Sequence, residues 1–219
     1  MAVITISREF GSKGSEVSQS VAKSLGYAYV DKTTIENVMN EYGLISFEHF
    51  YDEQYTIWDS FIGSNKEIIS MFSKTVQEFS KNDNTVMVGR AGFILLTGYE
   101  NVLHVLIRAP FEERVGNIMQ SMNIADRKQA RDMVLRNDQS RRTFVQTFYR
   151  ADTNDTDWFN LVLDTSCIPP ETAAKWIAEA AAQLDAKKKN PEKTTGALVS
   201  DAILKNVVDK QLAQAKRGG

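Results

Sequence analysis

The segment Phe10-Gly-Ser-Lys-Gly-Ser15 directly follows the β-branched run 2–7 and precedes a helical pattern. A loop in this position can present backbone N–H groups and a helix N-terminus to an anion. The common phosphate loop requires glycine, any four residues, glycine, lysine and then serine or threonine. Aligned on the flanking elements, its first glycine falls at Arg8, its lysine at Gly14 and its hydroxyl residue at Ser15. The segment therefore indicates either an altered phosphate loop or a plain turn.

Two further polar residues follow strand-like runs. Arg90 comes after an apolar run, and a guanidinium at the carboxyl end of a strand is more often a ligand group than part of a core. Asp31 follows a shorter run. It either serves a ligand or supplies the negative charge that favours a helix N-terminus, beside a capping box of Thr33 and Glu36.

Residues 126–149 form a predicted helix that is crowded with arginines. Such a run is usually a solvated face, and the acidic residues of the same stretch could pair with it. These acidic residues are Asp126, Asp132 and Asp138. A phosphate clamp is the alternative interpretation. The arginines that could form it are Arg131, Arg136, Arg141 and Arg142.

The elements that would position these residues alternate along the chain. Apolar and β-branched runs predict strands at 2–7, 27–30, 85–88, 102–107 and 161–163. Apolar residues at helical spacing predict helices at 16–25, 33–43, 66–81, 110–122, 126–149 and 170–185. This alternation predicts an α/β fold whose parallel sheet is covered on both faces. Ligands are then expected at the carboxyl ends of the strands.

The composition is that of an ordinary globular protein. The 219 residues are 42% hydrophobic and 25% charged, with a net charge of −2. This length suits one domain with a substantial core, and the charge favours no broad nucleic-acid surface. The chain shows no signal-peptide pattern, so we expect a cytoplasmic protein without nucleic-acid or membrane partners.

Metal ligands are not grouped along the sequence. Cys167 is the single cysteine, and no Cys/His cluster has metal-ligand spacing. His49 and His104 stand apart, so we expect structural roles for them. The aromatic-rich stretch 44–64 belongs either to the core or to a substrate site.

The C-terminal part of the chain differs from the rest. Residues 187–196 are polar and predict a linker, whereas 197–219 carry an apolar stripe at helical spacing. The stripe consists of Leu204, Val207, Val208 and Leu212. A helix of this kind cannot bury its stripe alone. It either docks on its own domain or drives a homo-oligomer.

Six motifs occur in order over residues 3–180. They are Ile4-Thr-Ile-Ser-Arg-Glu-Phe-Gly-Ser-Lys-Gly-Ser15, Tyr29-Val-Asp-Lys32, Val86-Met-Val-Gly-Arg90, Ile107-Arg-Ala-Pro-Phe-Glu-Glu-Arg114, Asp138 with Arg141, and Leu163-Asp-Thr-Ser166. Together they resemble the cytidylate kinase-like family of P-loop nucleoside monophosphate kinases. The resemblance implies a three-layer P-loop NTPase fold over 1–186, with a helical lid at about 123–157.

The same resemblance implies roles for individual residues. The donor ATP would bind a loop made of Arg8, Gly11, Ser12, Lys13, Gly14 and Ser15, and the Ser15 hydroxyl would also contact Mg²⁺. Lys13 or Arg8 would replace the missing lysine. Asp31 and Arg90 would face the acceptor nucleotide. Arg141 would clamp the donor phosphates as the lid closes, assisted by Arg142, Arg136 and Arg131.

The chain departs from true cytidylate kinases at several positions. Ala91 stands where those enzymes have an aspartate, and Val134 and Leu135 stand where they have an Arg-Asp pair. With Gly14, these changes weaken the case for efficient cytidylate kinase activity. Three functions follow as hypotheses: ATP-dependent phosphorylation of a nucleoside monophosphate, with CMP or dCMP first; nucleotide binding without turnover, as a sensor or assembly partner; and phosphorylation of a non-nucleotide acceptor.

Overall fold

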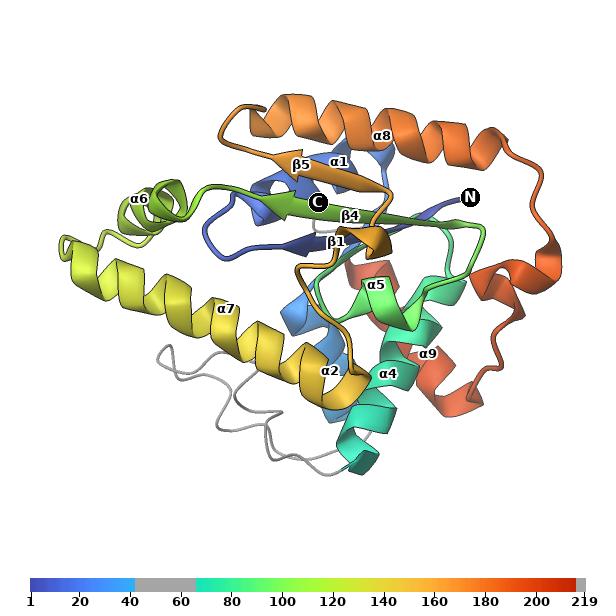
Figure 1. Ribbon diagram of the computed structural model, residues 1–219. Helices are drawn as coiled ribbons and strands as arrows, with labels where there is room; N and C mark the ends of the chain where they lie inside the picture. The colour runs from blue at the N-terminus through green and yellow to red at the C-terminus, as the bar shows by residue number, and fades with distance from the viewer. Residues whose placement is uncertain (42–65, 216–219) are drawn as a thin grey trace.

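The computed structural model describes residues 1–41 and 66–215. In these ranges five strands form one parallel sheet in the order β2-β3-β1-β4-β5 (Figure 1). The strands are β1 (Val3–Arg8), β2 (Ala28–Val30), β3 (Thr85–Val88), β4 (Val102–Arg108) and β5 (Leu161–Asp164). All five follow the predicted runs to within a residue or two, and the predicted P-loop type α/β fold is confirmed.

The central strand β1 shows why the sheet must be covered on both faces. Ile4 and Ile6 belong to one buried apolar cluster, whereas Val3 belongs to another. Successive side chains of a strand point to opposite faces, so each face presents its own apolar surface. Because a parallel sheet is buried on both faces, its strands are almost continuously apolar.

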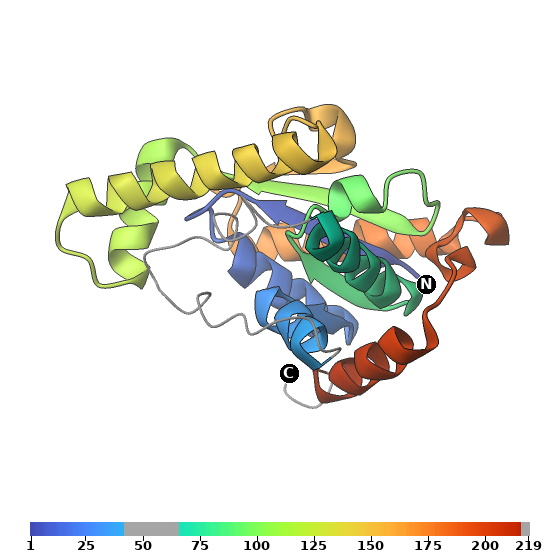
Figure 2. The same cartoon turned by 90° about the horizontal axis from the view of Figure 1, so that it is seen from below.

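Helices cover the two faces of the sheet. On one face lie α1 (Gly14–Leu25) and α8 (Pro170–Ala186), which contribute Val17, Val21 and Ile177 to the cluster around Ile4. The opposite face is covered by α2 (Lys32–Glu41), α4 (Lys66–Lys81), α5 (Gly92–Leu95) and α9 (Ala202–Ala215). Figure 2 shows α2, α4 and α9 side by side on this second face. This arrangement is the predicted three-layer architecture.

The predicted lid segment, about 123–157, contains α7 (Arg127–Tyr149), and α6 (Phe111–Ser121) precedes it. The first half of α7 packs on α6 through a small cluster of Val115, Ile118, Ala130 and Val134. The second half enters the main core, where the Phe144 and Phe72 rings meet edge to face at 6.2 Å. The helix is therefore anchored at one end, and closure of the 123–157 segment stays a prediction.

The start of α2 differs from its predicted start. The helix begins at Lys32, and the Asp31 carboxylate accepts hydrogen bonds from the Thr34 amide and hydroxyl, each at 3.1 Å. Asp31 is thus the N-cap, and the predicted capping box at Thr33 is wrong by two positions. The cause is local, because an aspartate that closes a strand can cap the helix that follows immediately.

The C-terminal part docks on its own chain. Within the predicted linker, Thr195 is buried and donates to the Ser80 carbonyl at 2.6 Å, while its amide binds the Asn101 side chain at 3.0 Å. The following helix α9 starts at Ala202, later than predicted. Its stripe residues Leu204, Val208 and Leu212 are buried in the main core.

This docking matches the first of the two interpretations of the stripe. Val207 packs against the same core from a partly buried position. A homo-oligomer through α9 would have to use its outer face, where Ile203 is 67% exposed, and it stays a prediction. Among the described residues, no helix is both long enough and apolar enough to cross a membrane. His49 and the aromatic stretch 44–64 lie outside the described residues.

Candidate functional site

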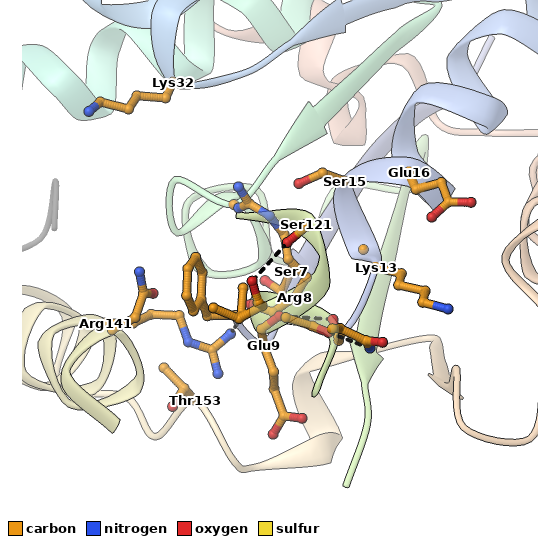
Figure 3. A pocket seen from close by; sticks show the side chains of 18 of the residues that line it. Ser7, Arg8, Glu9, Lys13, Ser15, Glu16, Lys32, Ser121, Arg141 and Thr153 are labelled. Atoms are coloured by element: carbon orange, nitrogen blue, oxygen red, sulfur yellow. Dashed lines mark hydrogen bonds between the residues drawn. The ribbon is translucent and has the colours of Figure 1, made fainter. Parts of the chain in front are cut away.

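A cavity of about 890 Å³ opens at the carboxyl ends of β1 and β3, between the first turn of α1 and the second half of α7. Eight of the predicted site residues line it. They are Arg8, Gly11, Ser12, Lys13, Gly14, Ser15, Arg90 and Arg141. Figure 3 shows part of this lining, with residues contributed by the loop after β1 and by α7. The position is the one expected for a ligand site in an open parallel sheet.

The loop between β1 and α1 has the backbone of a phosphate-binding turn. Gly11 has φ +83° and Lys13 has φ +58°, and α1 begins directly afterwards at Gly14. Residues in this left-handed region turn the chain so that the helix N-terminus faces the cavity. A Cβ at Gly11 would lie 2.6 Å from the Arg114 carbonyl oxygen, so a side chain would not fit there.

Ser12 and Ser15 have different surroundings within this loop. The buried Ser12 hydroxyl donates to the Glu9 carbonyl at 2.8 Å, and its amide donates to the same oxygen at 3.2 Å. Ser12 therefore shapes the loop in this conformation, and its contact with a donor phosphate stays a prediction. Ser15 is exposed in the first turn of α1 and faces the cavity. Its hydroxyl is placed where a ligand oxygen or a metal ion could reach it.

Three arginines from three elements converge on the cavity: Arg8 from the end of β1, Arg90 from the end of β3 and Arg141 from α7. Arg90 is only 3% exposed, and burial followed by the charge of Arg8 lowers its pKa to about 9. Burial also lowers the pKa of Arg8 and of Arg141. The Arg90 guanidinium remains charged at neutral pH, because a pKa of about 9 still lies above it.

Acidic and phenolic groups among the described residues act against this charge. Glu36, Asp31 and Tyr29 act to raise the pKa of Arg90, in that order of size. Burial raises the pKa of Glu36 itself, against the charges of Lys32 and Arg90. Among the described residues, the three guanidiniums together place positive charge along one side of the cavity. This charge favours a multiply charged anion, above all one with oxygens that match the planar guanidinium fork.

The backbone around Arg90 is strained. Gly89, Arg90 and Ala91 follow one another with φ values of +72°, +63° and +53°. A residue other than glycine in this region costs about 1–3 kcal/mol, and such strain clusters at functional sites. The turn ends β3 and starts α5, so Arg90 is held at the cavity while Ala91 is buried.

Arg141 connects α7 to the loop. Its Nη1 donates to the Arg8 carbonyl at 2.8 Å, and Figure 3 shows its side chain reaching from α7 toward the loop. Among the described residues, its buried Nε has no hydrogen-bond partner. After burial, Asp138 and Glu9 have the largest effects on its pKa, and both act to raise it. Arg141 therefore faces the cavity with donors left for a ligand.

Arg114 is a functional candidate that the sequence did not single out. Its guanidinium is buried, donates to the carbonyls of Ala109 and Phe10 at 3.1 and 3.3 Å, and pairs with Asp138 at 2.8 Å. Glu9 lies 3.5 Å from it and accepts the Ala109 amide at 3.1 Å. Arg114 thus ties the loop, α6 and α7 together. Its place in the motif Ile107–Arg114 was the only available signal.

The other predicted arginines lie elsewhere. Arg131 pairs with Glu112 and stacks over the Phe111 ring at 4.6 Å, while Arg136 donates to the Asp132 carbonyl within its own helix at 3.4 Å. Arg142 is exposed, and its charge acts on Arg141. In the described part of the chain, these three do not line the cavity. Their role in phosphate binding stays a prediction that requires movement of α7.

Asp31 and Lys13 differ in how they lie relative to the cavity. Asp31 does not line the cavity within the described residues; it caps α2 and acts on Arg8 and Arg90 through its charge. Both interpretations of Asp31 thus remain compatible with the structure. Lys13 is exposed, and its amine points away from Arg141 in Figure 3. The described residues contain no group of three or more His, Cys, Asp or Glu that could hold a metal ion.

Comparisons with known proteins agree with this geometry. The model of the cytidylate kinase-like family matches residues 3–167. The cytidylate kinase of Thermoplasma acidophilum is 25% identical over 178 residues, which is 80% of this chain and 89% of that protein. The cytidylate kinase of Methanocaldococcus jannaschii is 30% identical over 104 residues, 47% of this chain and 58% of that protein.

A solved structure shows the same fold. The crystal structure of an uncharacterized protein from Eubacterium ventriosum superimposes with a TM-score of 0.65 at 18% identity. The match covers 85% of this chain and 100% of that one.

Proposed function

Because this chain belongs to the cytidylate kinase-like family, we propose that it transfers a phosphoryl group from ATP to a nucleoside monophosphate, with CMP and dCMP the first candidates. The family relationship supports nucleotide kinase activity. The observation that carries the proposal is the convergence of Arg8, Arg90 and Arg141 on one cavity beside the N-terminus of α1. Phosphoryl transfer depends mainly on such positioning and on cations around the moving group.

The reaction needs no covalent step on the protein. An oxygen of the acceptor's phosphate forms a bond to the γ-phosphorus of ATP. At the same time the bond from that phosphorus to the bridging oxygen breaks, and its electron pair leaves with ADP. Negative charge is shared among the oxygens of the moving group throughout. The guanidiniums at the bottom of the cavity can stabilise that charge without reorganising.

The geometry suits two anions side by side. The loop and the first turn of α1 offer N–H donors for the donor phosphates, with Arg141 across from them. Arg90, at the end of β3, lies on the other side of Arg8 and suits the acceptor's phosphate. We expect the Arg8 guanidinium to lie between the donor phosphates and the acceptor's phosphate, where its positive charge attracts both.

Mg²⁺ fits this site as a shared ion. In proteins it is commonly held by few side chains together with substrate phosphates and waters. The exposed Ser15 hydroxyl in the first turn of α1 is the side chain that would contact it. When bound, the ion supplies charge neutralisation on the β- and γ-oxygens. The lack of a multidentate carboxylate cluster among the described residues agrees with an ion that arrives with its nucleotide.

A second candidate function, nucleotide binding without turnover, is favoured by one observation. Glycine occupies position 14, and buried apolar side chains occupy positions 91 and 134, where true cytidylate kinases carry charged groups. A protein of this kind would bind ATP and act as a sensor or assembly partner.

The first experiment is a coupled assay of ADP formation with ATP, Mg²⁺ and a panel of monophosphates led by CMP and dCMP. Arg141→Ala is the control. Turnover with one acceptor that is lost in the control supports the proposal. ATP binding without turnover on any acceptor contradicts it and supports the second candidate.

A further inference from the structure

Positions 8 and 14 have exchanged residue types relative to the common phosphate loop. That loop has glycine where this chain has Arg8 and lysine where it has Gly14. In the structure, the side chain of Arg8 lies against position 14. A Cβ built on Gly14 would lie 2.4 Å from the Cβ of Arg8 and 2.9 Å from its Cγ. The stem of Arg8 therefore occupies the space that a lysine at position 14 would need.

The far end of Arg8 is accommodated by a second glycine. A Cβ built on Gly89 would lie 2.5 Å from Nη1 of Arg8. The side chain thus starts at the end of β1, crosses the first turn of α1 and reaches the end of β3, immediately before Arg90. Two glycines that are distant in sequence leave the path for one arginine. This path takes a positive charge into the cavity between the loop and Arg90.

The charges around Arg8 leave it available for an anion. Among the described residues, its guanidinium takes part in none of the ion pairs within 4.0 Å. Tyr29 and Asp31 act on it from the side of β2, and Arg141 opposes them from α7. Burial without a full counter-charge is costly for a guanidinium, and a bound phosphate would remove that cost.

Lys13, the other cation of the loop, is less suited to this role. It stands where the common loop has its second glycine, adopts the left-handed conformation with φ +58°, and has an exposed side chain. Its amine points away from Arg141 in Figure 3. The cation that enters the cavity therefore comes from β1.

We propose that Arg8 takes the place of the phosphate-loop lysine, binding the γ-phosphate of ATP from strand β1, and that position 14 is glycine to make room for it. This inference rests on the proposed function, because it names the residue that holds the group to be transferred. Arg8 offers two parallel N–H donors where a lysine offers a point charge. Its charge also lies close enough to Arg90 to act on the acceptor's phosphate.

The test compares the single and double exchanges. Variants Arg8→Gln, Gly14→Lys and the pair Arg8→Gly with Gly14→Lys are purified and measured for ATP affinity by titration calorimetry and for kcat/KM. We expect Arg8→Gln to lower kcat/KM by about 100-fold or more, since it removes a preorganised donor from the moving group. Gly14→Lys should be as harmful, because Arg8 fills the space. The kcat/KM of the double variant should exceed that of each of these single variants by about tenfold or more, since the effects of substitutions at residues in contact are not additive.

Arg108→Gln is the matched control. Arg108 ends the neighbouring strand β4, is exposed and does not line the cavity among the described residues. The ATP affinity and the kcat/KM of Arg108→Gln should stay close to those of the parent chain. Thermal melting shows whether each variant folds, and Arg8→Lys, which keeps the charge, replaces Arg8→Gln if the latter does not fold. Arg8→Lys should retain more ATP affinity than the unpaired Gly14→Lys.

The outcomes separate this inference from the proposed function. If the parent chain binds ATP but turns over no acceptor, the proposed function fails, and ATP affinity alone still tests Arg8. If Arg8→Gln binds and reacts like the parent, or if the pair is no better than the single variants, the inference about Arg8 is overturned while the proposed function stands. If the parent chain binds no ATP, both are wrong.

Discussion

The two halves of α7 carry the same kind of residue in different surroundings. In the first half, Arg131 pairs with Glu112 at the surface, and Leu135 is 50% exposed. In the second half, Arg141 binds the loop backbone inside the cavity, and Phe144 is fully buried in the core. A run of arginines on one helix is thus divided by tertiary contacts into a solvated part and a ligand-facing part. The boundary lies where Arg114 pairs with Asp138.

The largest contrast is expected in stability. Phe144→Ala should lower the free energy of unfolding by about 3–5 kcal/mol, because it removes a fully buried aromatic side chain. Leu135→Ala, nine residues earlier on the same helix, should change it by less than about 0.5 kcal/mol. Urea unfolding monitored by circular dichroism measures both. Equal losses in the two variants would mean that the outer face of the first half of α7, which carries Leu135, is also covered in solution.

The next contrast is in activity. Arg141→Ala should lower kcat/KM by about 100-fold or more, as expected when a preorganised donor is removed from the moving phosphoryl group. Arg136→Ala should have a much smaller effect, since Arg136 bonds within its own helix. Steady-state kinetics with the best acceptor measures both. A comparable loss in Arg136→Ala would show that the first half of α7 also reaches the phosphates during the reaction.

A smaller effect is expected from pH. The pKa of Arg90 is lowered to about 9, so the free site loses a proton as the pH rises through that value. An anionic acceptor stabilises the charged guanidinium, and binding above pH 9 must therefore take the proton up again. Acceptor affinity should be constant from pH 7 to 8.5 and then fall by up to about tenfold per pH unit. The Arg90→Gln variant should bind the acceptor weakly and lose this pH dependence. If the acceptor affinity of the parent chain is constant to pH 10, Arg90 does not bind the acceptor's phosphate.

The smallest effect is expected at the solvated end of α7. Glu112→Gln removes the partner of Arg131 and Arg127, and both ion pairs are exposed. Pairs of this kind contribute little, since water and salt screen them. The melting temperature and kcat/KM should stay within error of the parent chain. A clear loss of activity would assign the α6–α7 end a part in closure over the nucleotide.

Much of this arrangement was accessible from the sequence because it depends on local patterns. The β-branched run before Ser7 and the helical spacing after Gly14 placed the loop, and the alternation of elements placed Arg90 at the edge where ligands bind. The cap of α2 was misplaced because Thr33 and Asp31 are both good N-caps, and only the end of β2 decides between them.

The sequence by itself determined the fold class, the family, and which residues stand at the ends of strands, since these follow from period, order and motif. The tertiary structure alone decided which cations enter the cavity. Arg8 does so because Gly14 and Gly89, 75 positions apart, both leave it space, whereas Lys13 and Arg131 point elsewhere. Side-chain direction and free volume depend on neighbours that are remote in sequence, so no local pattern contains them.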